Sequence, residues 1–311
     1  MGLDPKAANA RFHDAAAPTF DSKWGLAFDA RAQAYVRRRL ALLPPDRYQR
    51  VLDLGCGTGF FLLNLGQLGY VERPYGCDIS LEMLRRLREN AAQLGHGVPL
   101  VVGDIERLPY RDHTFQLVVG HGFLHHAPDP REVLEEAFRV LSPGGSLLVA
   151  GEPTRTGDRV ARAVGRLTWR TYRRISRALP LLRRNDPQPP EDSEADLIRR
   201  LEFAVDLHAF DPHVLAECAR SAGFEGVRVA TDEFLASAGG WIRRTLEAEA
   251  PDGLLGLRWA SMNRLADGAL RWIDDRFLLK LLPKSAFSNI VMYGTKPGIR
   301  PASLLGRGDR R

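Results

Sequence analysis

Short apolar runs alternate with amphipathic helical patterns through the middle of the chain. Between the runs, apolar residues recur every three or four positions, and Ser80 and Gly95 are suited to begin and end one such helix, at 81–94. The runs that predict buried strands are 51–54, 75–79, 100–104, 115–119 and 146–150. Strands that alternate with helices predict an α/β fold with a parallel, doubly wound sheet.

The same rhythm resumes near the C-terminus after two interruptions. A helix is expected from Pro212, with Asp211 as its N-cap, and strands are expected at 227–230 and 288–294. We therefore divide the chain into an N-terminal helical arm or lid (1–45), a first core part (46–152), a basic helical insertion with a proline-rich linker (153–207), a continued core (208–231), a helical cap (232–287), a last core strand (288–297) and a tail expected to be disordered (298–311).

Composition narrows the class of protein. The 311 residues are 44% hydrophobic and 26% charged, which excludes a wholly disordered chain and a polytopic membrane protein. No apolar run reaches the ~18 residues of a membrane span, and the N-terminus lacks the apolar core of a signal peptide. The three cysteines lie in apolar or glycine-rich contexts, without the spacing of a zinc site. We expect a cytoplasmic protein with reduced thiols and no metal.

A glycine-rich loop follows the first predicted strand of the core. Gly55, Gly57 and Gly59 allow a sharp turn and a close approach of a ligand to the backbone. Asp53 precedes them at the end of the strand, where its charge would repel a pyrophosphate but attract an ammonium group. Taken alone, the loop could be a tight connection between strand and helix; with Asp53 it favours a ligand that carries an amino acid.

Two further acids end the next two predicted strands. Asp78 can accept hydrogen bonds from two ribose hydroxyls, and Asp104 can accept one from an exocyclic adenine amine. The neighbouring Ile79 and Ile105 can pack on the faces of the base. The carboxyl ends of parallel strands share one edge of the sheet, so these residues predict a nucleoside pocket there.

These motifs, together with 115–130 and 136–145, resemble the class I S-adenosylmethionine-dependent methyltransferases, especially the group that contains quinone-biosynthesis C-methyltransferases. The resemblance implies a Rossmann-like, seven-stranded, mostly parallel sheet in the order 3-2-1-4-5-7-6 with strand 7 antiparallel. It implies S-adenosylmethionine as cofactor and S-adenosylhomocysteine as product. The cofactor-binding residues that it implies are Asp53, Gly55, Cys56, Gly57, Gly59, Asp78, Ile79, Met83, Asp104, Ile105, Gly120 and His121.

Three histidines follow the fourth predicted strand. Methyl transfer is an in-line displacement that needs aligned reactants, and a hydroxyl or acidic C–H nucleophile must also lose a proton, for which an imidazole is suited. The resemblance makes His125 the first candidate for a catalytic base, with His121 and His126 as alternatives. Each could instead cap a helix or bond a carbonyl, and an amine or thiolate nucleophile would need no base. We expect His13, in the arm, to be a solvated or core histidine.

The insertions suggest where an acceptor could bind. The aromatic residues Phe20, Trp24 and Phe28 could form a lid that contacts cofactor or substrate, or could pack as ordinary helix residues. Ten arginines and two aspartates lie between 153 and 186, mostly on one stripe of a helix expected at 155–179. This helix could be a solvated face, a contact for an anionic membrane surface, or a nucleic-acid contact, which we expect least.

Together these features predict an enzyme that methylates an O or C nucleophile of a hydrophobic small molecule or lipid-like acceptor. The Gly-His-Gly-Phe sequence at 120–123 differs from the Asn/Asp-Pro-Pro-aromatic signature of exocyclic amine methylases that act on bases. The alternatives are an RNA methyltransferase that uses the arginine-rich helix and a non-catalytic binding protein with a methyltransferase fold. The oligomeric state stays open.

Overall fold

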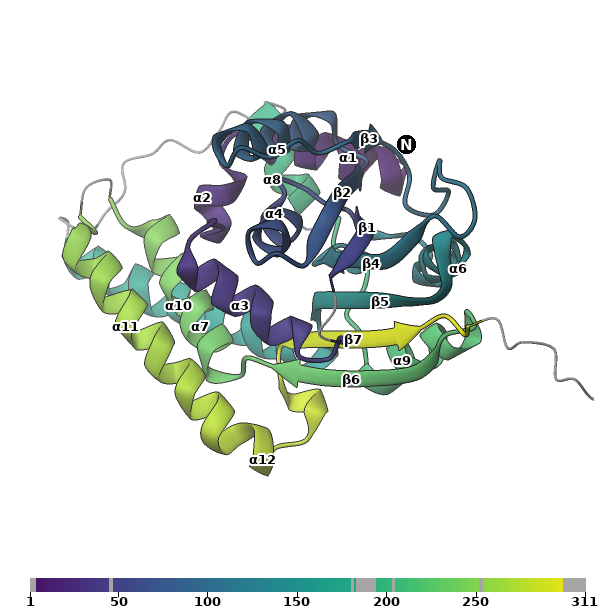
Figure 1. The fold of residues 1–311 in the computed structure, drawn as a ribbon. Coiled ribbons are helices and arrows are strands. Elements are labelled where there is room, and N and C mark those ends of the chain that lie inside the picture. The colour runs from purple at the N-terminus through teal and green to yellow at the C-terminus, as the bar shows by residue number, and fades with distance from the viewer. Residues whose placement is uncertain are drawn as a thin grey trace, which may run out of the picture.

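One twisted sheet forms the centre of the computed structural model, which describes residues 4–298 apart from 45–46, 180–181, 183–193, 203–204 and 252–253 (Figure 1). Its strands are β1 (Tyr48–Leu54), β2 (Val71–Asp78), β3 (Leu100–Val102), β4 (Phe115–His121), β5 (Leu141–Pro153), β6 (Glu225–Asp232) and β7 (Asn289–Thr295). The order is β3-β2-β1-β4-β5-β7-β6; β1 to β5 pair in parallel, and β7 is antiparallel to both of its neighbours. The predicted fold class and strand order are confirmed.

Helices cover both faces of the sheet because the side chains of a strand alternate between its two faces. Leu52 of β1 packs in the cluster that includes Leu134, whereas the neighbouring Val51 packs in the cluster that includes Phe61. The helices next to the sheet are α4 (Phe60–Gln67), α5 (Leu81–Gln93), α6 (Pro130–Val140) and α9 (Pro212–Ser221). The expected caps are present: the Ser80 hydroxyl accepts from Met83 N, and the Asp211 carboxylate accepts from His213 N.

The N-terminal arm is helical, as expected, but it is broken into three pieces. These are α1 (Pro5–Ala16), α2 (Phe20–Trp24) and α3 (Ala30–Leu40). Gly25 ends α2 in the left-handed conformation with φ +64°, so the chain changes direction after Trp24. As a result, Phe20, Trp24 and Phe28 do not share one helical stripe.

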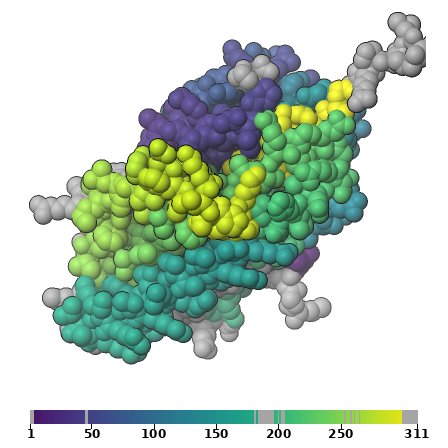
Figure 2. Space-filling view, turned by 90° about the horizontal axis from the view of Figure 1, so that it is seen from below, coloured from purple at the N-terminus to yellow at the C-terminus, as the bar shows by residue number. Residues whose placement is uncertain are grey.

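The two insertions build a helical layer beside the sheet. They contain α7 (Arg155–Ala178), α10 (Leu235–Glu249), α11 (Leu257–Ile273) and α12 (Leu279–Leu281), with the short helical turns η3 (Asp274–Leu278) and η4 (Lys284–Ala286). Helix α8 (Glu194–Glu202) belongs to the first insertion but packs on α1, and the turn η1 (Leu124–His126) follows β4 in the core. Helix α10 packs between α7 and α11. Figure 2 shows α11 and α12 in yellow-green beside the N-terminal segment in purple, with α7 in teal along the opposite edge.

Two sequence predictions lie outside this description. The proline-rich linker and nearly all of the tail at 298–311 fall on residues that the structure does not describe. Among the helices that it does describe, none combines the length and the apolar character that crossing a bilayer requires. The cytoplasmic location and the contact of α7 with a membrane surface stay predictions.

Candidate active site

A cavity of about 1460 Å³ lies at the carboxyl ends of β1, β2 and β4. Asp53, Asp78 and His121 line it from these strands, and Trp24 and Trp241 line it from α2 and α10. The cavity therefore lies between the sheet edge, where open α/β sheets bind ligands, and the helices of the arm and the cap.

Asp53 is a buried carboxylate with an unused oxygen. Its side chain lines the cavity, only 1% of the residue is exposed, and Oδ1 has no hydrogen-bond partner among the described residues. Burial, together with the negative charge of Asp78, raises the pKa of Asp53 well above its ordinary value. A ligand ammonium group would supply both the missing donor and the opposite charge.

The glycine loop follows Asp53 in a conformation that side chains disfavour. Gly55, Gly57 and Gly59 have φ values of +58°, +50° and +89°. A Cβ at Gly55 would lie 2.6 Å from Phe123 Cβ, and one at Gly59 would lie 2.7 Å from Leu87 Cγ. Gly57 has open space instead, which leaves the backbone accessible from the cavity.

Asp78 connects the glycine loop to the second strand. Its Oδ2 accepts from Gly57 N at 2.8 Å, and its Oδ1 accepts from Ser80 N at 2.9 Å. Burial raises the pKa of Asp78, although these two hydrogen bonds and the nearby His13 oppose the shift. Each oxygen keeps a second lone pair, so the carboxylate can still accept from two ligand hydroxyls.

Asp104 has a partner that the sequence did not suggest. Lys6 of α1 lies with Nζ 2.6 Å from Asp104 Oδ2, and it also pairs with Glu106. Both Asp104 and Ile105 line the cavity, as does Ile79. A hydrogen bond that an adenine amine donates to Asp104 stays a prediction, and the amine would then share the carboxylate with Lys6.

Four of the predicted residues lie just outside the cavity lining. Met83 is fully buried in the core, and Phe28 packs with Leu84 and Leu87. The structure does not bring these two side chains into the site. Gly59 and Gly120 lie outside the lining too, but their lack of a side chain leaves room for neighbouring residues. A Cβ at Gly120, for example, would lie 2.2 Å from Phe123 Cε1.

His125 forms a buried pair with Glu152, a residue that sequence analysis missed. His125 Nδ1 lies 2.8 Å from Glu152 Oε2, and the same carboxylate accepts from the backbone N–H groups of Phe123, Leu124 and His125. Burial alone would lower the pKa of His125, but the hydrogen bond and charge of Glu152 and the charge of Asp206 raise it. Burial alone would raise the pKa of Glu152, but His125 and the backbone donors lower it. This arrangement, a base oriented by a carboxylate, is suited to accept a proton at Nε2.

The other candidate bases are engaged differently. The Tyr35 hydroxyl lies 2.8 Å from His121 Nε2, and burial, with the charge of Arg39, lowers the pKa of His121 to about 4. His126 uses Nδ1 on the carbonyl of Val205, and burial lowers its pKa well below the ordinary value. Both rings line the cavity, but geometry favours His125 as the base.

His13 was expected to be a solvated or core histidine, but it lines the cavity. Its ring centroid lies 5.1 Å from that of His126 in an edge-to-face contact. The signal for such contacts is absent from the local sequence, because α1 meets the core only in the folded chain. Glu152 could have been found, since it lies near the end of the fifth strand, as the three predicted acids do on theirs.

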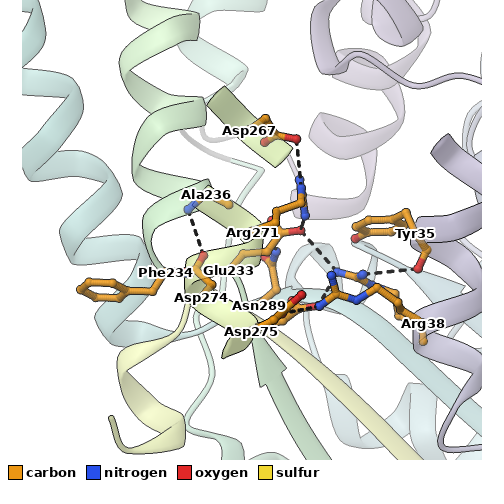
Figure 3. Close-up of polar contacts among 12 residues, drawn as sticks. Tyr35, Arg38, Glu233, Phe234, Ala236, Asp267, Arg271, Asp274, Asp275 and Asn289 are labelled. Carbon is orange, nitrogen blue, oxygen red and sulfur yellow. Dashed lines mark hydrogen bonds and ion pairs between the residues drawn. The ribbon is translucent and has the colours of Figure 1, made fainter. Parts of the chain in front are cut away.

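A network of charged side chains ties the arm to the cap beneath Tyr35 (Figure 3). Arg271 of α11 pairs with Glu233 and with Asp267, which also pairs with Arg31 of α3. The buried Arg39 lies 2.6 Å from Asp232 Oδ2 and 3.4 Å from the ring centroid of Tyr35. These pairs hold Tyr35, and through it His121, against the cavity.

The fold and the site together define a class of protein. It is a Rossmann-like α/β domain whose acids and glycine loop suit a nucleoside that carries an amino acid. Residues 52–149 match the family model described as a methyltransferase domain. These residues therefore form a methyltransferase domain, and for this domain the predicted resemblance to the class I S-adenosylmethionine-dependent methyltransferases and the predicted cofactor are confirmed.

Curated relatives match mainly in this domain. A 2-methyl-6-phytyl-1,4-hydroquinone methyltransferase 2 of Oryza sativa subsp. japonica is 38% identical over 114 residues, 36% of this chain and 32% of that protein. A demethylmenaquinone methyltransferase of Bacillus mycoides is 34% identical over 135 residues, 42% of this chain and 56% of that protein. The matches thus span from about a third to little more than half of these relatives.

Solved structures share the fold over most of the chain. A phosphoethanolamine N-methyltransferase 2 of Haemonchus contortus, in complex with phosphomonomethylethanolamine and S-adenosylhomocysteine, has a TM-score of 0.58 at 14% identity and covers 96% of this chain and 61% of that one. The [4+2]-cyclase SpnF has a TM-score of 0.55 at 17% identity and covers 93% and 95%. At these identities the likeness concerns the fold alone.

The residues at the sheet edge fit the cofactor of this class. The unpaired Asp53 Oδ1 suits its amino group, and the lone pairs left on Asp78 suit its ribose hydroxyls. The open side of Gly57 lets the backbone approach it.

Proposed function

We propose that the protein transfers a methyl group from S-adenosylmethionine to an oxygen or carbon nucleophile of a hydrophobic small molecule. One observation carries the proposal: His125, which Glu152 orients, lines the same cavity as Asp53, whose Oδ1 has no hydrogen-bond partner among the described residues. A site that only bound the cofactor would have no use for an oriented base beside it.

The chain's own residues have distinct tasks in this reaction. When bound, S-adenosylmethionine supplies an electrophilic methyl group on a sulfonium. Asp53 and Asp78 hold the two polar ends of the cofactor. His125 accepts the proton of the acceptor hydroxyl or acidic C–H at Nε2 while Nδ1–H stays on Glu152, whose charge stabilises the imidazolium. The cap and arm exclude water from the nucleophile.

The lining of the cavity supports a largely apolar acceptor. Phe20, Trp24, Trp241 and Trp272 line it from the arm and the cap. The names of the two curated relatives concern quinone or hydroquinone substrates, which are hydrophobic and lose a proton on methylation of a ring carbon or oxygen. The fold by itself does not decide the reaction, since a neighbour of similar fold is described as a cyclase.

A transfer assay tests the proposal. Protein is incubated with methyl-tritiated S-adenosylmethionine and either an organic-solvent cell extract or total RNA. We expect label in the organic-soluble fraction, lowered about 10²- to 10⁴-fold by His125→Gln, with unchanged affinity for S-adenosylhomocysteine. The matched control is His96→Gln, because His96 is exposed and lies outside the cavity lining.

Three outcomes would contradict the proposal or the role of its base. Label in RNA instead of the organic fraction would favour an RNA methyltransferase, and cofactor binding without label in either would favour a binding protein. Equal transfer by wild type and His125→Gln would remove His125 from the chemistry.

A further inference from the structure

Two arginines on α10 differ from the other arginines that line the cavity. Those with carboxylate partners are Arg31, Arg38, Arg39, Arg162 and Arg271. Within the part of the chain that the structure describes, the guanidinium groups of Arg243 and Arg244 form no hydrogen bond and no ion pair, although both residues line the same cavity.

Arg244 is held by aromatic rings instead. Its guanidinium carbon lies 4.6 Å from the ring centroid of Trp24 and 5.4 Å from that of Trp241. Burial, with the charge of Arg243, lowers the pKa of Arg244, yet an arginine stays charged at neutral pH. The charges of Glu233 and Glu247 oppose this shift, but neither carboxylate forms an ion pair with Arg244. Glu233 pairs with Arg39 and Arg271, and Glu247 accepts from Trp259 Nε1 at 2.9 Å.

This arrangement is costly for the protein without a ligand. A desolvated guanidinium that lacks an anionic partner keeps its hydrogen-bonding capacity unused, and cation–π contacts replace only part of the lost hydration. Two like charges on consecutive residues add repulsion. An incoming carboxylate or phosphate would relieve both effects, because the planar fork of arginine binds such groups with two parallel hydrogen bonds.

A row of rings joins this point to the candidate base. Ring centroids lie 6.3 Å apart for Trp24 and Phe20, 6.0 Å for Phe20 and His13, and 5.1 Å for His13 and His126. The His126 and His125 centroids are 3.9 Å apart. Along the cavity wall, aromatic rings therefore connect Arg244, which has no ion-pair partner among the described residues, to His125, the candidate base.

We propose that Arg244, supported by Arg243 and flanked by Trp24 and Trp241, binds an anionic group of the acceptor, a carboxylate or a phosphate, at the cap end of the cavity. The acceptor is then an amphiphilic acid whose apolar body lies along the rings and whose nucleophile lies near His125. This inference rests on the proposed function and names the acceptor's chemical class.

Matched probes separate the charge from the apolar body. Decanoate, decyl phosphate and decanol are titrated into the full-length protein by calorimetry. We expect at least one of the two anions to bind 10-fold or more tightly than decanol, and the stronger of the two identifies the preferred group. Arg244→Gln should lose about 10- to 100-fold of that affinity while decanol binding is unchanged.

Further variants separate recognition from folding. Arg244→Lys keeps the charge but not the fork and should bind the anion with intermediate affinity. Arg166→Gln, on the exposed side of α7 outside the cavity lining, is the control and should bind as wild type does. Melting curves report whether each variant folds; if Arg244→Gln does not, the lysine variant and the comparison of anions with decanol in wild type decide.

The outcomes distinguish this inference from the proposed function. Equal binding of decanol and both anions, or equal anion affinity in wild type and Arg244→Gln, overturns the anion site even where S-adenosylhomocysteine binds. A parallel loss of S-adenosylhomocysteine affinity in Arg244→Gln would assign the arginine to the cofactor's carboxylate and also overturn it. Anion selectivity in a protein that transfers no methyl group would support the site and refute the proposed function.

Discussion

Replacing Glu152 with glutamine changes the charge behind the candidate base with little change in shape. Glu152 Oε1 accepts from Phe123 N and Leu124 N, both at 3.0 Å, and Oε2 accepts from His125 N at 3.1 Å and from His125 Nδ1 at 2.8 Å. The residue is 0% exposed, so water cannot replace a lost acceptor.

The hydrogen bonds to Glu152 determine how much stability and turnover the substitution should cost. A glutamine oxygen can serve two of the four donors, and its NH₂ group then faces the other two. His125 Nδ1 can become an acceptor for that NH₂ group, so one backbone donor, His125 N, is left without an acceptor. Such a buried donor costs about 1–3 kcal/mol, and we expect the free energy of unfolding to fall by about that amount. The NH₂ group also favours the tautomer of His125 that carries its proton on Nε2, which cannot accept another. Turnover should fall about 10²- to 10⁴-fold.

The direction in which the pH–rate profile shifts separates a role of Glu152 in tuning His125 from a purely structural role. In wild type, kcat/KM should rise with pH through a His125 pKa above its ordinary 6.5, because only the neutral ring is a base. Without the charge of Glu152, burial lowers this pKa, and the rising limb should move to lower pH. The folded-state pKa of Glu152 is below its ordinary 4.5, so its stabilisation is present above that value and is lost in acid. The stability difference between wild type and variant should therefore shrink in acid.

The assay combines pH–rate profiles with urea unfolding. Glu135→Gln is the matched control, since that side chain is 48% exposed and pairs with Arg131 on α6 at 3.0 Å. We expect its loss of stability to stay below about 1 kcal/mol. An unshifted pH profile in Glu152→Gln, with turnover near that of wild type, would refute the proposed base.

Two further substitutions test the geometry at the sheet edge. Asp53→Asn should weaken binding of S-adenosylhomocysteine about 10- to 100-fold by calorimetry. It should also raise the Tm at neutral pH but not in acid, because the raised folded-state pKa of Asp53 means that its ionised form destabilises the fold; equal Tm values at neutral pH would contradict this. Gly120→Ala should lower the free energy of unfolding by about 1–3 kcal/mol, since its Cβ would meet the Phe123 ring at 2.2 Å. Gly66→Ala, in α4 with open space around it, is the control and should stabilise by up to about 1 kcal/mol; similar effects at both positions would argue against the close contact.

The sheet and its ligand edge were predictable because their signals are local. Buried strands appear as apolar runs, and Asp53, Asp78 and Asp104 stand at or just beyond the ends of such runs, so one rule of parallel sheets places them on one side. The same rule applied to the fifth strand would have found Glu152.

The rest of the site depends on how separate helices pack. Lys6 reaches Asp104 and Tyr35 reaches His121 across long stretches of sequence, and no local pattern encodes such contacts. Phe28 was considered as part of a lid with Trp24, but Gly25 turns the chain between them. The unpaired state of Arg244 becomes visible only once every other partner in the cavity is placed.

Calorimetric titration of S-adenosylhomocysteine and NADH into wild type and Asp78→Ala tests the central claim most directly. We expect S-adenosylhomocysteine to bind and NADH not to bind, and Asp78→Ala should lose about 2–4 kcal/mol of binding free energy with its two ribose hydrogen bonds. Asp112→Ala, whose carboxylate is exposed and pairs with Arg139 away from the cavity, should bind as wild type does. Binding of NADH in place of S-adenosylhomocysteine, or unchanged affinity in Asp78→Ala, would show that Asp53, Asp78 and the glycine loop do not form an S-adenosylmethionine site.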